Sequence, residues 1–135
     1  VAVGNPHCVL FTHEPPPAGA ELAAWGRALG HHPAFPGGIN VEFAQPISPT
    51  GLAVTVWERG SGATLACGTG ACAVAAAAVL TGRCPRGALI LVQLPGGTLE
   101  VCVQRDDTVL LTGDAAATFS GTVLIQPCKA PRGVV

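Results

Sequence analysis

The chain has 135 residues, of which 49% are hydrophobic and 11% are charged, and its formal net charge is −1. This composition suits one domain with a well-filled core and argues against intrinsic disorder. A nucleic-acid partner is not expected, because the sequence has no basic patch. No signal peptide is visible, and no apolar stretch approaches the roughly 20 residues that span a bilayer. We therefore expect a cytoplasmic protein without membrane contact.

The N-terminal part of the chain alternates turns with short regular elements. Val1 opens the chain abruptly, as if within a domain, and residues 4–7 form a turn before a strand at 8–12. A short amphipathic helix is predicted at 21–29, with Leu22, Trp25 and Leu29 on one face and Gly30 as its stop. A loop separates it from two alternating strands, at 39–45 and 52–58. In the first of these strands, Ile39, Val41 and Phe43 face one way and Asn40 and Glu42 face the other.

The stretch from Trp57 to Arg83, WERGSGATLACGTGACAVAAAAVLTGR, organises the rest of the chain. Its alanine-rich run predicts a helix that starts at about Cys67 and ends near Gly82 and Pro85. The run has no polar face, so we expect the helix to be buried on all sides.

Further strands are predicted after this helix, and the last residues look like a loose tail. The strands fall at 88–94, 98–104, 108–112 and 118–125, and turns separate them. We expect an α+β fold in which a mostly antiparallel sheet curls into a barrel around the central apolar helix. The domain should span residues 1–125, and the tail residues 126–135.

The position of Cys67 predicts chemistry. A helix N-terminus presents unpaired N–H groups and partial positive charge, which favour a thiolate and can bind a carboxylate or phosphate. The alternative is an inert packed thiol, as expected for most of the six cysteines: Cys8, Cys67, Cys72, Cys84, Cys102 and Cys128. Three disulfides in a secreted protein remain possible, although the core needs no cross-links. No C-x-x-C pair occurs, so a zinc site is not expected.

Four sequence features could meet at one site. They are Asn5-Pro6-His7, Asn40, Glu58-Arg59 and Cys67-Gly68-Thr69. Each also has an ordinary structural interpretation: a histidine after a turn, a strand-edge asparagine, a solvated ion pair and a packed thiol. Their chemistry becomes specific only in combination.

In combination these segments resemble the diaminopimelate epimerase family. The resemblance is carried by GNPH (4–7), NVEF (40–43), WERGSGATLACGTGACA (57–73) and LPGGTLEV (94–101). It concerns the C-terminal half of the family chain and extends to about Leu124. It implies an isomerase that interconverts LL- and meso-diaminopimelate, on the bacterial route to lysine and peptidoglycan, without pyridoxal phosphate or a metal. No cofactor is therefore expected.

The resemblance also implies roles for individual residues. In the family, two cysteines face each other across the α-carbon of the substrate, one removing a proton as thiolate and the other delivering one as thiol. Cys67 matches one of the two, and His7 and Glu58 match side chains that assist proton transfer. The positions that match substrate-binding residues are Asn5, Asn40, Arg59, Gly68 and Thr69. Arg59 suits a distal carboxylate because a guanidinium is a bidentate donor.

The sequence departs from the family in one large respect. The half that carries the second cysteine, in a Cys-Gly-Asn-Gly motif, is absent, and no other cysteine has that glycine context. The chain should therefore hold half an active site and need an N-terminal epimerase domain as partner, besides its small-molecule substrate and a possible second copy in a homodimer. Two alternatives stay open: a related cofactor-independent racemase or isomerase for another amino acid, and a non-catalytic binding half-domain.

Overall fold

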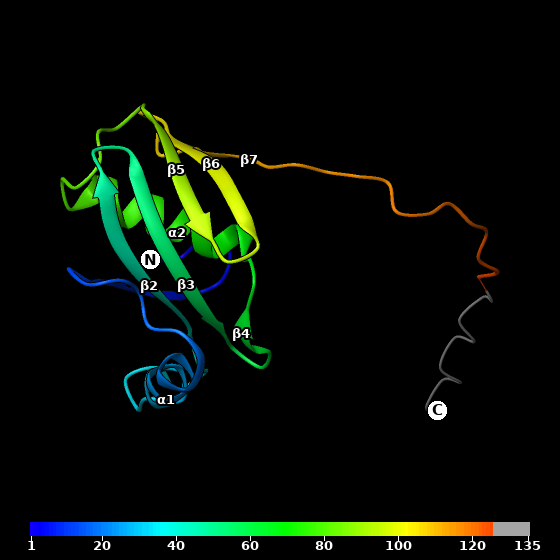
Figure 1. Ribbon diagram of the computed structural model, residues 1–135, viewed down its shortest axis with the longest axis horizontal. Coiled ribbons are helices and arrows are strands. Elements are labelled where there is room, and N and C mark those ends of the chain that lie inside the picture. Colours follow the sequence, from blue (N-terminus) through cyan, green and yellow to red (C-terminus); the bar gives the residue numbers. More distant parts are fainter. Residues whose placement is uncertain (126–135) are drawn as a thin grey trace, which may run out of the picture.

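Residues 1–125 are described by the computed structural model shown in Figure 1; the predicted tail, with Cys128, lies outside the described residues. The predicted α+β class is confirmed. The elements in the described residues are β1 (His7–Phe11), α1 (Gly19–Gly30), β2 (Asn40–Ser48), β3 (Gly51–Glu58), β4 (Gly62–Thr64), α2 (Gly68–Leu80), β5 (Leu89–Leu94), β6 (Gly97–Val103) and β7 (Val109–Thr112). Neither helix of this part of the chain has both the length and the apolarity needed to cross a membrane.

All the strands belong to one mixed sheet with the order β1-β2-β3-β5-β6-β7, in which β4 pairs with the end of β3. The pairs β1–β2 and β3–β5 are parallel, and the other four are antiparallel. Each parallel pair is joined through a helix, as parallel strands require. Helix α1 crosses from β1 to β2, and α2 crosses back to β5 on the opposite face (Figure 1).

Helix α2 forms the centre of the main core, as its composition predicts. Its side chains are mostly methyl groups, and Ala71, Ala73, Ala75 and Ala78 are completely buried. The sheet curls over the helix, which contacts β1, β2, β5, β6 and β7. Small side chains allow this close approach of helix and sheet on several sides at once.

The prediction of a barrel is wrong, because the sheet does not close around α2. No pairing joins β1 to β7 within residues 1–125, and Leu80 at the end of α2 is 68% exposed. A hollow of about 410 Å³ lies beside α2 in this region, lined partly by residues 1–3 and by Val103 and Val109. The uniform apolarity of the helix suggested burial on all sides, and this expectation is therefore wrong.

The strand predicted at residues 118–125 is also wrong. These residues pair with no strand, and Phe119 and Leu124 are 89% and 93% exposed. After β7 the described chain runs away from the folded body (Figure 1). The short strand β4 was not predicted, because its three residues, Gly-Ala-Thr, carry no hydrophobic alternation.

Helix α1 covers the other face of the sheet with a smaller core. Leu22 packs there with Val41 and Phe43 of β2. Trp25 was predicted to share the buried face with Leu22, but it is 54% exposed. The residue of α1 that packs against β3 is instead Gly26. The ring of Trp57 occupies the space that a side chain at position 26 would need.

Candidate active site

Cys67 is the N-cap residue of α2, as predicted. It has extended backbone angles (φ −143°, ψ 111°), and its Sγ accepts a hydrogen bond from the backbone N–H of Gly70 at 3.3 Å. The N–H groups of Gly68 and Thr69 donate to no partner among the described residues and remain available for an anion. The sulfur is half-buried, so a ligand can reach it. This geometry places an anion site at the helix start, beside the sulfur.

The turn before β1 reaches the start of α2. Asn5 Nδ2 donates to Thr69 Oγ1 at 3.4 Å, and Thr69 Oγ1 lies 3.6 Å from Cys67 Sγ. Asn5 Oδ1 in turn lies 2.9 Å from His7 Nε2. Four predicted site residues, two from the start of the chain and two from its middle, therefore form one row of contacts that ends at the sulfur of Cys67.

The other end of His7 contacts a residue that the sequence analysis did not select. His7 Nδ1 lies 2.6 Å from Glu42 Oε1, and both side chains are completely buried. Burial is the main cause that raises the pKa of Glu42. The alternation of β2 had placed Glu42 on the same face as Asn40. The alternation could not show that α2 covers this face, so that an acidic side chain there points into the core.

A second cluster contains the other predicted site residues. Asn40 Oδ1 accepts the backbone N–H of Arg59 at 2.8 Å, and Arg59 Nη1 donates to the carbonyl of Gly37 at 2.8 Å. Glu58 Oε1 accepts from Thr64 Oγ1 at 2.7 Å. Asn40 therefore holds the turn that carries Arg59. Neither Glu58 nor Arg59 has a hydrogen bond or ion pair to Cys67 within residues 1–125.

Strand register brings the two clusters to the same end of the sheet. His7 at the start of β1 pairs with Asn40 at the start of β2. On the other side of β2, Val41 pairs with Trp57, which directly precedes Glu58. The predicted site residues thus come from neighbouring strand ends and from the start of the helix that these strands cover.

Apolar side chains are exposed beside this end of the sheet. Leu65, two residues before Cys67, is 70% exposed, and Leu111 of β7 is 44% exposed. A side chain at Gly68 would begin 3.2 Å from Leu111 Cδ2, so Leu111 lies directly against the start of α2. The rim of the site is therefore partly apolar and uncovered in this chain.

The other described cysteines lack the setting of Cys67. Cys72 and Cys84 are buried, and burial raises the pKa of each thiol. Burial, followed by the nearby carboxyl group of Glu42, also raises the pKa of Cys8. The described cysteines are free thiols, so no disulfide framework forms among residues 1–125. This part of the chain also contains no group of three or more His, Cys, Asp or Glu side chains that could hold a metal ion.

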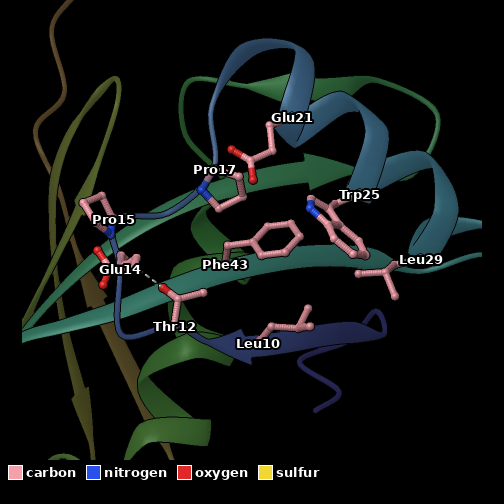
Figure 2. A pocket seen from close by; sticks show the side chains of 9 residues that line it. All are labelled: Leu10, Thr12, Glu14, Pro15, Pro17, Glu21, Trp25, Leu29 and Phe43. Atoms are coloured by element: carbon pink, nitrogen blue, oxygen red, sulfur yellow. Dashed lines mark hydrogen bonds between the residues drawn. The ribbon is translucent and has the colours of Figure 1, made fainter.

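A hollow of about 340 Å³ lies on the opposite face of the sheet, between α1 and the first two strands. Figure 2 shows Trp25 of α1 facing Phe43 and Leu10 across it, with the carboxylates of Glu14 and Glu21 at one end. Its lining is mainly apolar and contains no sulfur, histidine or cation. We therefore assign the chemistry to the Cys67 end of the sheet.

Comparison with known proteins gives one consistent result. The sequence profile described as diaminopimelate epimerase matches residues 1–118, which include every predicted site residue. A diaminopimelate epimerase of Synechococcus elongatus is 49% identical over 123 residues, which are 91% of this chain and 42% of the relative. One of Microcystis aeruginosa is 50% identical over 90% of this chain and 42% of the relative. One of Synechococcus sp. strain JA-2-3B'a(2-13) is 53% identical over 90% and 43%, respectively.

Fold and site together define a cysteine-bearing α+β domain whose sulfur stands at a helix N-terminus. The chain belongs to the diaminopimelate epimerase family. It spans less than half the length of the curated relatives that it matches.

Proposed function

We propose that this chain supplies one half of the active site of a diaminopimelate epimerase, with Cys67 as one of two opposed acid/base groups. The observation that carries the proposal is the capping of α2 by Cys67. Its sulfur receives the Gly70 N–H at 3.3 Å and faces the Thr69 hydroxyl at 3.6 Å, beside free N–H groups that suit a carboxylate.

The proposed reaction is proton transfer at the α-carbon of the amino acid. Cys67 as thiolate takes the α-proton, so an S–H bond forms, the Cα–H bond breaks, and the electron pair stays on Cα, where it is delocalised into the α-carboxylate. An acid on the opposite face then protonates Cα and inverts it. In the reverse direction Cys67 as thiol is the proton donor. The N–H groups of Gly68 and Thr69 stabilise the negative charge that develops on the carboxylate.

The remaining residues are proposed to bind substrate and to support the sulfur. Arg59 is exposed and uses one nitrogen for Gly37, which leaves further donors of the guanidinium for a distal carboxylate. Asn5 lies beside the start of α2, where it can contact substrate, whereas Asn40 acts by holding Arg59. Glu58 is held by Thr64 at the end of β3, and its proposed role there is to assist proton transfer.

The acid on the opposite face is proposed to come from a second domain. The same domain is proposed to cover the apolar rim at Leu65 and Leu111. Within residues 1–125, Cys67 is the one cysteine at a helix start. An incomplete site also agrees with the length of the relatives, which is more than twice what this chain matches.

The test is exchange of the α-proton in deuterated water, measured on diaminopimelate with this chain alone and with this chain joined to the N-terminal region of a relative. The joined enzyme should epimerise, and Cys67→Ser should abolish epimerisation with little change in the urea midpoint. Full turnover by this chain alone would refute the half-site. Turnover of a monocarboxylic amino acid in preference to diaminopimelate would favour a related racemase, and inactivity of the well-folded joined enzyme would favour a binding half-domain.

A further inference from the structure

Glu42 is a buried acid that the proposed reaction does not use. It lies near the start of β2, two residues after Asn40, and its side chain is 0% exposed. Oε1 contacts His7 Nδ1 at 2.6 Å, whereas Oε2 has no hydrogen-bond partner among the described residues. Burying a carboxyl group is unfavourable, and an apolar residue of similar size would serve the core better. Its position therefore indicates a purpose other than packing.

The contacts of His7 determine where its protons must be. Nε2 faces Asn5 Oδ1 at 2.9 Å, and an amide oxygen has no proton to donate. Nε2 must therefore carry a proton and donate it to Asn5. The contact between Nδ1 and Glu42 Oε1 then holds one further proton, which belongs either to the imidazole or to the carboxyl group. Asn5 and Glu42 together select this arrangement, and without Glu42 only the contact with Asn5 opposes the tautomer protonated at Nδ1.

The orientation of His7 is passed on to the sulfur. Because Asn5 Oδ1 accepts from His7, the amide presents its Nδ2–H groups to Thr69 Oγ1 at 3.4 Å. With that lone pair used, the Thr69 hydroxyl is free to donate its proton to Cys67 Sγ at 3.6 Å. All donors in the row then point toward the sulfur, where they join the N–H of Gly70. Such a row stabilises negative charge at its end.

We propose that Glu42 is a positioning residue that fixes His7 with Nε2 protonated and so directs hydrogen bonds through Asn5 and Thr69 onto the sulfur of Cys67. This role rests on the proposed function of Cys67 as an acid/base group. Glu42 does not touch the reacting atoms and acts on them only through His7.

Gly70 provides the space in which Glu42 and Cys67 approach the first turn of α2. A Cβ atom at Gly70 would lie 3.0 Å from Glu42 Oε1 and 3.2 Å from Cys67 Sγ. The absent side chain thus lets the first turn of α2 rest on the carboxyl group while its N–H reaches the sulfur. The titratable groups around Glu42 are His7, Cys8, Glu58, the amino group of Val1 and, across Gly70, the thiol of Cys67.

The experiment compares Glu42→Leu, Glu42→Gln and the unchanged chain. Leucine fills the space without a hydrogen bond, whereas glutamine can still hold Nδ1 of His7. A matched control is Gln45→Leu. Gln45 lies on the same strand as Glu42 but outside the row, and its side chain donates a hydrogen bond to the carbonyl of His13. Two properties are measured without substrate: the ¹⁵N chemical shifts of the His7 ring, and the rate at which iodoacetamide labels Cys67, resolved by peptide mass spectrometry.

In the unchanged chain the His7 spectrum should show a protonated Nε2. Glu42→Leu should shift His7 toward the other tautomer and slow the labelling of Cys67 by about tenfold, as expected from losing one hydrogen bond to a charged group. Glu42→Gln should restore most of the rate, and Gln45→Leu should change neither property. A purely structural role would change only the urea midpoint of Glu42→Leu.

An unprotonated Nε2 in the unchanged chain would overturn the proposal even if Glu42→Leu fails to fold. So would a Cys67 labelling rate in folded Glu42→Leu within twofold of the unchanged chain. Both readouts are independent of turnover, so an inactive joined enzyme with these effects intact would refute the proposed function and not the role of Glu42. In an active joined enzyme, Glu42→Leu should lower kcat by a similar factor and leave KM unchanged.

Discussion

Gly26 of α1 should resist substitution by alanine, although it lies inside a helix. Its backbone angles suit any residue, and alanine is normally the better helix former by about 1 kcal/mol. In this structure, however, a Cβ atom at position 26 would lie 2.2 Å from Trp57 Cγ, 2.4 Å from Cδ2 and 2.7 Å from Cβ. Ordinary contacts begin at about 3.4 Å, so Gly26→Ala requires α1 or the tryptophan to move by more than 1 Å.

The balance of these two effects gives the expected size. Overpacking a well-filled contact costs about 1–3 kcal/mol, and the short distances to the fixed base of Trp57 place this case at the upper end. Subtracting the gain in helix propensity leaves a net loss of about 2 kcal/mol. The urea midpoint should therefore fall by about 1 M with an unchanged slope. Because Trp57 directly precedes Glu58, its displacement should also disturb the Arg59 end of the site.

The assay is urea unfolding followed by circular dichroism. Ala24→Gly is the matched control, because Ala24 is exposed on the same helix and should lose only about 1 kcal/mol of helix propensity. Repeating Gly26→Ala in a Trp57→Ala background removes Cγ and Cδ2, the two nearest atoms, and should abolish most of the loss, which a double-mutant cycle reports directly. An unchanged or higher midpoint for Gly26→Ala alone would refute the packing argument.

Three further results are expected. Asn40→Ala should lower the free energy of unfolding by about 1–2 kcal/mol, because it leaves the backbone N–H of Arg59 without its acceptor. Asn40→Asp keeps an acceptor and should not lower it, and equal urea midpoints for the unchanged chain and both variants would contradict this role. Burial raises the pKa of Glu42, so the folded chain keeps a proton that the unfolded chain loses. The stability of the unchanged chain relative to Glu42→Gln should therefore fall as the pH rises above the ordinary glutamate pKa of 4.5. Parallel curves of stability against pH for the two chains would argue against it. Iodoacetamide should label half-buried Cys67 at least about tenfold faster than Cys72, whose thiol pKa is raised by burial; the rates should converge in urea, and equal rates in the folded chain would exclude an activated sulfur.

The local signals in the sequence were sufficient for the centre of the site. The glycines before Cys67 and the alanines after it predict a helix start, and the structure has Cys67 as the N-cap residue. The strand bounds agree to within one residue in β3, β5 and β6. Strand β2 continues to Ser48, three residues beyond its predicted end. These elements were predictable because propensity, alternation and turn residues all indicate the same structure.

The errors concern what the elements pack against. Residues 118–125 are apolar enough for a strand, but a strand needs a partner, and none is present among the described residues. Closure of the sheet failed for the same reason. Gly26 was invisible to hydrophobic periodicity because the contact consists of an absent side chain facing Trp57. Glu42 was placed on the correct face of β2, yet its importance depends on α2 covering that face, which is a long-range property.

The alanine-rich body of α2 also limits how the site can evolve. Ala71, Ala75 and Ala78 have no exposed surface, so a larger side chain there has to push the whole helix away from the sheet. A helix moves as a rigid rod over this length, and Cys67 at its tip would move with it. The methyl groups thus act as spacers that set the height of the sulfur above the sheet. Substitutions two or three turns from Cys67 should therefore change the labelling rate of its sulfur while preserving every residue of the candidate site.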